Sequence, residues 1–425
     1  MFMNFFMLVH LIIVSAHLSY RLYQHLIPVM KSVQLLFLVL LLSFLNMSKA
    51  YGQVKTYDAE WKRVDALLKT RGLPQSALTE VKKIYATAKK EKQDAQVIKA
   101  LVYMTQLQQQ TREEAAPKAI AEIESEITKM GQPAASLLKS YLAGLYLQYF
   151  QQARWRIYER TSTIGFDKKD IATWSADDFH NRITELFLQS LQPEKILKAT
   201  GLKAYDAIIN KGNVRHLRPT LFDLLAHRAL DYFKSGEREL NKPAYAFEIT
   251  SPQAFAPAAQ FAKATFESRD TFSLKRQAFL LYQNLISFHL ADAKKDALID
   301  VDVDRIQFAY QHSVAENKDS LYVAALQHIT QQYSTYAAAQ AWYLLAAHYE
   351  QLASTYQPFE DTTYRYHRVK AKEILERVVR DSAQKSAAWA SSYNLLQHIQ
   401  QAQFQFSIEK VNVPGAPFRA LVTYK

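Results

Sequence analysis

Residues 219–233 read PTLFDLLAHRALDYF, and this stretch sets the pattern that the rest of the chain follows. Pro219 stands at its front, where a helix tolerates proline because the first backbone N–H groups have no partner inside the helix. The apolar side chains then recur every three or four residues, which is the spacing of one helical face. They are Phe222, Leu225, Ala226, Ala229 and Phe233. The stretch therefore predicts an amphipathic helix that begins at Pro219 and buries one face.

Outward from this stretch, the same spacing returns many times. Gly72 with Pro74, and Gly131 with Pro133, separate successive periodic segments, as helix ends and starts do. Ser175-x-x-Asp178 is a capping box that predicts the start of another helix. Short amphipathic helices cannot bury their apolar faces alone, so we expect them to stack pairwise in an array. The segments with helical spacing include 57–68, 77–88, 98–102, 120–130, 137–149 and 179–187.

One segment resembles a tetratricopeptide repeat. Residues 342–349 reproduce the W-x2-L-G-x2-Y spacing, with Ala346 in the place of the glycine. A second helix is expected to carry Ala371, Leu375 and Val378 on one face. The connection 351–367 is longer than the repeat has. The sequence thus predicts a mainly α fold, a tetratricopeptide-like helical array of the α-solenoid type, over residues 53–401.

The pattern changes at about Ala402. Phe404, Phe406 and Ile408 alternate with polar residues, which is the period of a strand. Residues 414–417 read PGAP and predict a turn, and a second strand is expected over 418–424. A lone strand pair is not stable unless it packs on more structure. Either the protein continues into a β domain, of which residues 402–425 are the truncated start, or the strands dock on the helices.

The N-terminus has the pattern of a signal peptide over residues 30–52. Met30-Lys31 gives a basic start, residues 35–45 are apolar, and the small Ala50 and Gly52 fit a cleavage site before Gln53. The pattern therefore predicts export, and the family resemblance described below implies a periplasmic or outer-membrane-associated location. The signal peptide would enter the membrane only transiently. Residues 1–29 form a second apolar stretch. Either the start codon is assigned too far upstream and translation begins at Met30, or residues 5–18 are a membrane anchor.

Composition excludes many classes of chemistry. The 425 residues contain no cysteine, which excludes disulfides, thiolate zinc sites and a cysteine nucleophile. The nine glycines are never closer than eleven positions, so no Walker loop, dinucleotide fingerprint or G-x-S-x-G elbow can be written. The net charge of +12 is spread over interspersed Lys, Arg, Asp and Glu, as on solvated helix faces. We therefore expect no enzyme, no catalytic residue, no cofactor, no metal and no nucleic-acid partner.

Two polar clusters are candidate sites. Asp300, Asp302 and Asp304 resemble the opening of a calcium loop, but that loop needs Gly and Glu where this chain has Arg305 and Gln311. A solvated acidic cluster near a helix end is the preferred interpretation.

His227 lies beside an apolar stripe and is interpreted as an interior histidine rather than a ligand or base. Asp223 and Arg228 are close enough along a helix for local pairing with it.

Two aromatic segments are candidate binding surfaces. Residues 154–160 mix arginines with Trp155 and Tyr158 and could stack on nucleic acid or sugar, although packing at the end of the preceding apolar helix is favoured. A second set of aromatic residues, within 333–356, could line a concave ligand-binding face. Their helical spacing favours packing between helices instead. It consists of Tyr333, Tyr336, Trp342, Tyr343, Tyr349 and Tyr356.

Three phrases together resemble a known family. They are YDAEWKRVD (57–65) followed by GLPQSAL (72–78), PTLFDLLAHRAL (219–230), and VPGAPF (413–418). They are similar to the helical N-terminal region of bacterial alpha-2-macroglobulin-like proteins of Gram-negative envelopes, and the resemblance spans almost all of 53–425.

The resemblance implies a non-catalytic region of an exported endopeptidase inhibitor whose β-rich continuation consists of macroglobulin-type sandwiches. Such proteins trap proteases after a bait segment is cut, and many capture them with a thioester. This chain has no cysteine and no recognisable bait segment, so no functional residue is carried over. Proteases and envelope proteins are the implied partners. The alternatives are a periplasmic tetratricopeptide-like scaffold for partner proteins or peptides, and a glycan-binding surface protein.

Overall fold

The computed structural model describes residues 56–109, 112–159, 170–238, 242–357, 360–381 and 386–402, and in the last stretch 404–408, 411, 413–415, 417 and 419–424. The predicted signal peptide over 30–52, the cleavage site before Gln53 and both interpretations of residues 1–29 lie outside these residues. The described part divides into two compact units, with the boundary after Glu80.

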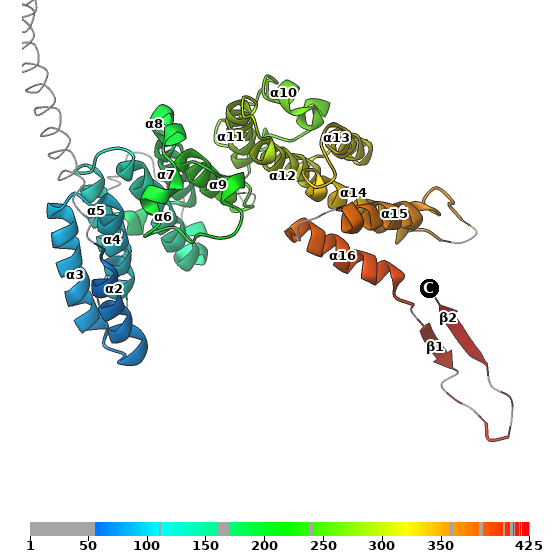
Figure 1. The fold of residues 1–425 in the computed structure, drawn as a ribbon, viewed down its shortest axis with the longest axis horizontal. Helices are drawn as coiled ribbons and strands as arrows, with labels where there is room; N and C mark the ends of the chain where they lie inside the picture. Colours follow the sequence, from blue (N-terminus) through cyan, green and yellow to red (C-terminus); the bar gives the residue numbers. More distant parts are fainter. Residues whose placement is uncertain are drawn as a thin grey trace, which may run out of the picture. The chain divides into compact units, whose positions relative to one another are not determined.

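The described chain is mainly helical, as the sequence predicts, and ends in a small two-stranded antiparallel sheet (Figure 1). A π-helical turn, η1 (Ala66–Thr70), continues the first helix. The α-helices are α2 (Asp58–Asp65), α3 (Pro74–Lys90), α4 (Asp94–Gln109), α5 (Ala115–Ile127), α6 (Ala134–Tyr158), α7 (Ala176–Ser190), α8 (Glu194–Ala199), α9 (Leu221–Phe233), α10 (Ala258–Phe261), α11 (Leu274–His289), α12 (Asp296–His312), α13 (Lys318–Gln332), α14 (Ala339–Ala353), α15 (His367–Asp381) and α16 (Ala387–Gln400).

The helix starts follow local sequence signals. Helix α3 begins at Pro74, after Gly72 turns the chain with a φ of +61° that a β-carbon would strain. The predicted capping box of α7 is confirmed, because Ser175 and Asp178 each accept a backbone hydrogen bond from the other. Helix α9 begins two residues later than predicted. Thr220 and Asp223 form a second capping box there, and this box rather than Pro219 sets the start.

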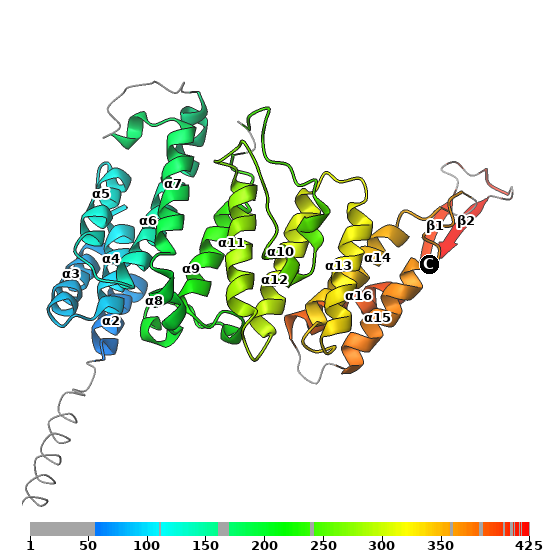
Figure 2. The ribbon, with the colours of Figure 1, turned by 90° about the horizontal axis from the view of Figure 1, so that it is seen from above.

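In the second unit, helices pack mainly on helices that are near them in sequence. Helix α6 packs on α5 and α7, α11 on α9 and α12, and α13 on α12 and α14. Figure 2 shows α11, α12 and α13 side by side. Aromatic side chains fill several of these contacts, and Phe150, Phe179, Phe233 and Phe279 are fully buried. The apolar faces predicted from spacing are therefore covered by neighbouring helices, which stabilises each helix beyond its own propensity.

Helices α14, α15 and α16 form one packed group. Ala346 of α14, Ala371 and Leu375 of α15, and Leu396 of α16 make one apolar cluster, and Val378 of α15 joins a second. These contacts confirm that the helix carrying the W-x2-L-A-x2-Y segment packs on the next helix.

Strands β1 (Phe404–Ile408) and β2 (Ala420–Tyr424) pair antiparallel after α16. Phe404 lies opposite Tyr424, Phe406 opposite Val422, and Ile408 opposite Ala420. The two predicted strands are thus confirmed, with β2 beginning at Ala420. Of the predicted turn, Pro414 and Gly415 lie in a turn, while residues 416 and 418 lie outside the described residues.

Candidate interaction surfaces and polar clusters

The three aspartates at 300, 302 and 304 lie inside helix α12 and do not converge. Asp302 is only 5% exposed and pairs with Arg305 on the same helix. Asp304 faces elsewhere, where it accepts hydrogen bonds from Tyr282 Oη at 2.6 Å and Lys234 Nζ at 3.0 Å. The expected solvated cluster is therefore wrong, because burial and ion pairing hold two of the three carboxylates. Within the described residues no group of His, Cys, Asp and Glu is placed to bind a metal ion.

Arg305 connects α12 to the segment before α10. Its guanidinium donates to the backbone oxygens of Ala254 at 2.6 Å and Ala256 at 3.0 Å. It also lies 4.4 Å from the centre of the Phe261 ring, and none of its surface is exposed. A buried cation persists only when its donors are satisfied, and here a carboxylate, two carbonyls and an aromatic face satisfy them. The arrangement is a structural anchor rather than a reactive group.

His289 at the end of α11 lies between two carboxylates. Its Nε2 is 2.9 Å from Asp223 Oδ1 on α9, and its Nδ1 is 2.7 Å from Asp292 Oδ2. Burial acts to lower the pKa of His289, but the hydrogen bonds that its ring donates to Asp223 and Asp292 outweigh burial, so the pKa is raised above its usual value. With a carboxylate at each ring nitrogen, the imidazolium form satisfies both contacts.

His227 is buried, as the sequence predicts, and burial lowers its pKa to about 4. The expected pairing of Asp223 with His227 and Arg228 is wrong. Asp223 instead caps α9 and contacts His289, while Arg228 Nε donates to Ser140 Oγ at 3.0 Å. The long-range contacts form because α9 directs Asp223 toward α11 and Arg228 toward α6 rather than toward each other.

The segment around Trp155 is divided between packing and exposure. Arg154 pairs with Glu237 at 2.8 Å, and Tyr158 Oη donates to the backbone oxygen of the same residue at 2.8 Å. Ile157 is buried, which confirms the packing interpretation for these three residues of the segment. Trp155 differs, because 80% of its surface is exposed.

The aromatic residues near α14 mostly pack between helices, as preferred from their spacing. Tyr343 and Tyr349 contact the apolar cluster of α14, α15 and α16, and Trp342 contacts the second cluster. Tyr336 is the exception, since it is 40% exposed. Among the described residues, the aromatic side chains of α14 therefore form no solvent-exposed row that could bind a ligand.

The terminal hairpin presents an apolar face to solvent. By register, Phe404, Phe406, Ile408, Ala420 and Val422 share one face of the two strands. The two phenylalanines are 69% and 59% exposed, and their rings lie 5.6 Å apart. Contiguous exposed apolar side chains of this kind are typical of interaction surfaces.

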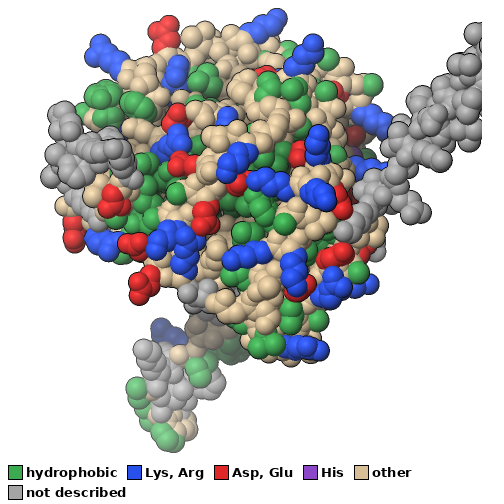
Figure 3. Space-filling view, turned by 90° about the vertical axis from the view of Figure 1, so that its left-hand side faces the viewer, with side chains coloured by type: hydrophobic (Ala, Val, Ile, Leu, Met, Phe, Trp, Pro, Cys, Tyr) green, Lys and Arg blue, Asp and Glu red, His purple; other side chains and the backbone are tan. Residues whose placement is uncertain are grey.

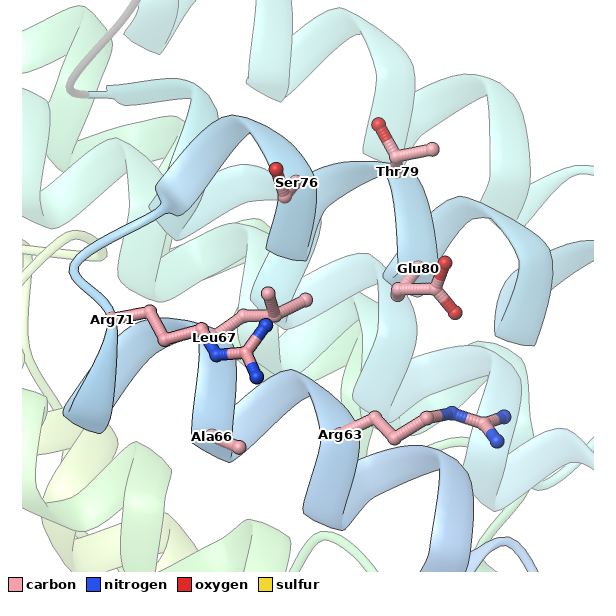
Figure 4. Close-up of a pocket in the computed structure, with 7 residues that line it drawn as sticks. All are labelled: Arg63, Ala66, Leu67, Arg71, Ser76, Thr79 and Glu80. Atoms are coloured by element: carbon pink, nitrogen blue, oxygen red, sulfur yellow. The ribbon is translucent and has the colours of Figure 1, made fainter.

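A second surface is a groove in the first unit, which we call the α2–α3 groove. Its volume is about 580 Å³. Figure 4 shows Arg63, Ala66, Leu67 and Arg71 on the side of α2 and η1, and the remaining lining residues on α3. Sequence reasoning missed this groove, because nothing in the spacing of the residues predicts which polar side chains face one another across a helix pair. Its lining residues are Arg63, Ala66, Leu67, Arg71, Ser76, Thr79 and Glu80.

Comparison with known proteins gives no relative. No family model, no curated protein and no solved structure matches this chain. Among the helices that the structure describes, none combines the length and the apolar character needed to cross a membrane.

Proposed function

We propose that this chain is the non-catalytic helical region of an exported alpha-2-macroglobulin-like protein, an endopeptidase inhibitor of the cell envelope. The observation that carries the proposal is the terminal hairpin, in which Phe404, Phe406 and Ile408 are exposed on one face. Two strands do not form a stable sheet alone, so an apolar face of this kind fits the beginning of a β-sandwich. The helices then act as a spacing or docking array, with no catalytic act of their own.

The first test is the reading frame at and beyond codon 425. A continuation of roughly a thousand residues or more with strand periodicity supports the proposal. A stop codon directly after Lys425 overturns it.

The second test is inhibition by the full-length product. If the inhibition is trapping, the protease is enclosed while its active site stays free, so large substrates are excluded and small ones can still enter. We therefore expect the full-length product to slow trypsin cleavage of casein and to leave cleavage of a small chromogenic peptide unchanged. Equal inhibition of both substrates, or of neither, contradicts the proposal.

The hairpin supplies the matched variants. Phe406→Ser with Ile408→Ser removes two apolar side chains from the proposed sandwich face and should reduce the yield of the folded inhibitor. Ser407→Ala, on the opposite face by register, is the control and should leave the yield unchanged. If the two variants behave alike, the apolar face of the hairpin has no role in the larger protein.

A second candidate is a tetratricopeptide-like scaffold that binds partner proteins or peptides. The observation in its favour is the packing of α14 on α15 and α16, which places the W-x2-L-A-x2-Y residues between helices as in such repeats. A chain that ends at Lys425 and captures a defined partner through its helices would favour this function over protease trapping.

A further inference from the structure

The α2–α3 groove is built from two kinds of surface. Ala66 and Leu67 form an apolar part, and Arg63 and Arg71 stand on either side of it along α2 and η1. In Figure 4 Glu80 lies at the same end of the groove as Arg63, while Arg71 lies at the other end. The groove therefore offers two cations, an apolar centre and one acidic group at a defined end.

The two arginines have no carboxylate partner among the described residues, and both are exposed. This sets them apart from arginines elsewhere in the described chain that hold ion pairs of 2.7 to 2.9 Å. Those pairs are Arg112–Glu122, Arg154–Glu237, Arg182–Glu124 and Arg368–Glu350. A guanidinium offers five N–H donors in a planar fork that suits carboxylates, so two of them beside one groove leave a large donor capacity unused.

The backbone at the groove is also unusual. The turn η1 is π-helical, and Arg71 N donates to Ala66 O at 3.2 Å across its wider ring. Gly72 follows with a φ of +61° and ends the segment at Arg71. Single π-helical turns are uncommon and occur frequently at functional sites. The π-turn fixes where Ala66, Leu67 and Arg71 stand relative to α3.

Figure 3 shows the side of the molecule to which α3 belongs, where Lys and Arg side chains are spread among hydrophobic ones. Residues 58–90 contain eight Lys or Arg and four Asp or Glu. An acidic chain that approaches this pair of helices therefore meets a net positive charge before it reaches the groove.

We propose that the α2–α3 groove binds an extended acidic peptide segment of a partner protein. One carboxylate of the segment pairs with Arg71, an apolar side chain rests on Ala66 and Leu67, and a second carboxylate pairs with Arg63. Glu80 opposes the carboxylate at the Arg63 end, so Arg71 makes the stronger contact. This binding needs only the groove and its charges, so it does not depend on the family proposed above.

The test uses the purified chain and a short fluorescein-labelled peptide that carries Glu residues on both sides of one Leu. A second peptide has Gln in place of each Glu. Fluorescence anisotropy should show binding of the Glu peptide, weaker binding of the Gln peptide, and a loss of affinity as salt is raised. Equal binding of the two peptides, or no binding of the Glu peptide, overturns the proposal.

Two double variants separate the groove from overall charge. Arg63→Gln with Arg71→Gln should weaken binding of the Glu peptide by about tenfold or more, which corresponds to about 1.4 kcal/mol. Arg156→Gln with Arg269→Gln removes the same charge from two exposed arginines outside the groove and should leave affinity within about twofold. Equal losses in the two double variants would mean that net charge and not the groove recognises the peptide. Circular dichroism of each variant verifies that the helices remain folded.

Glu80→Gln provides a test in the opposite direction. Removing the acidic group should strengthen binding of the Glu peptide by a few fold, because the carboxylate at the Arg63 end no longer faces a like charge. Weaker binding in Glu80→Gln contradicts the arrangement proposed here.

Discussion

Nε2 of His289 lies 2.9 Å from Oδ1 of Asp223, although 66 positions separate the two residues in the sequence. The same aspartate uses its other oxygen to accept from the backbone and hydroxyl of Thr220, at 2.8 and 2.7 Å. One carboxylate therefore starts helix α9 and holds the end of α11. Both side chains are almost completely buried, so the contact is shielded from solvent.

This contact predicts how stability depends on pH. The pKa of His289 is raised in the folded protein, so the imidazolium favours the folded state. The stabilisation is complete below the pKa of an unfolded histidine, near 6.5, and is lost as pH rises through the raised folded value. Urea unfolding of the wild type from acid to alkaline pH should show this loss.

His289→Gln should remove that part of the pH dependence and lower stability at pH 5–6 by about 1.5–3 kcal/mol, the range for hydrogen bonds to charged groups. The exposed His328→Gln is the control and should follow the wild-type curve. A His289→Gln protein whose pH profile matches the wild type would contradict the prediction.

Asp302 and Arg305 form a buried ion pair, so we expect the effects of substituting them on the free energy of unfolding to be non-additive. Arg305→Met leaves Asp302 buried without its cation and should cost about 3–5 kcal/mol. Asp302→Leu with Arg305→Met removes both charges and should be less destabilising than Arg305→Met alone, because no uncompensated carboxylate remains. Urea denaturation of the single and double variants measures the difference. Both variants lack the backbone contacts of Arg305 and differ only at residue 302, so a double variant that is less stable than Arg305→Met would contradict the prediction.

Because of the contacts of its aspartates, α12 should not bind calcium, and Ca²⁺ should not change the stability of the protein. Asp302 is committed to Arg305, and Asp304 to Lys234 and Tyr282, so binding an ion would break existing contacts. The midpoint of thermal unfolding should agree within about 1 °C between millimolar Ca²⁺ and excess EDTA, since only a ligand that prefers the folded state raises it. A rise of several degrees with Ca²⁺ would mean that the carboxylates rearrange to hold the ion.

The helical architecture could be predicted because its causes are local. Spacing of apolar residues, Pro74 after Gly72, and the Ser175 and Asp178 capping box all act within one or two turns. The strands followed from the alternation around Phe406. Pro219 predicts a start of α9 that is two residues too early, because the capping box of Thr220 and Asp223 sets the first helical residue.

The polar clusters could not be predicted, because their partners are distant in sequence. Successive helical residues are about 100° apart, so Asp302 points away from the face shared by Asp300 and Asp304, and no loop brings the three together. Asp223 has acceptable local partners in His227 and Arg228, yet tertiary packing gives it His289 instead. The arginines of the α2–α3 groove gave no periodic signal, because an exposed charge at any helical position looks the same in sequence.

The small sheet of β1 and β2 has open edges. Within the part of the chain that the structure describes, β1 and β2 pair only with each other, so the outer edge of each strand has backbone N–H and C=O groups without a strand partner. A third strand can therefore add on either side, and the phenylalanines decide which surface of the enlarged sheet turns inward. If the hairpin remains uncovered when the chain is purified, we expect two chains at high concentration to associate first by pairing the edges of their hairpins. The helices would not take part in this contact.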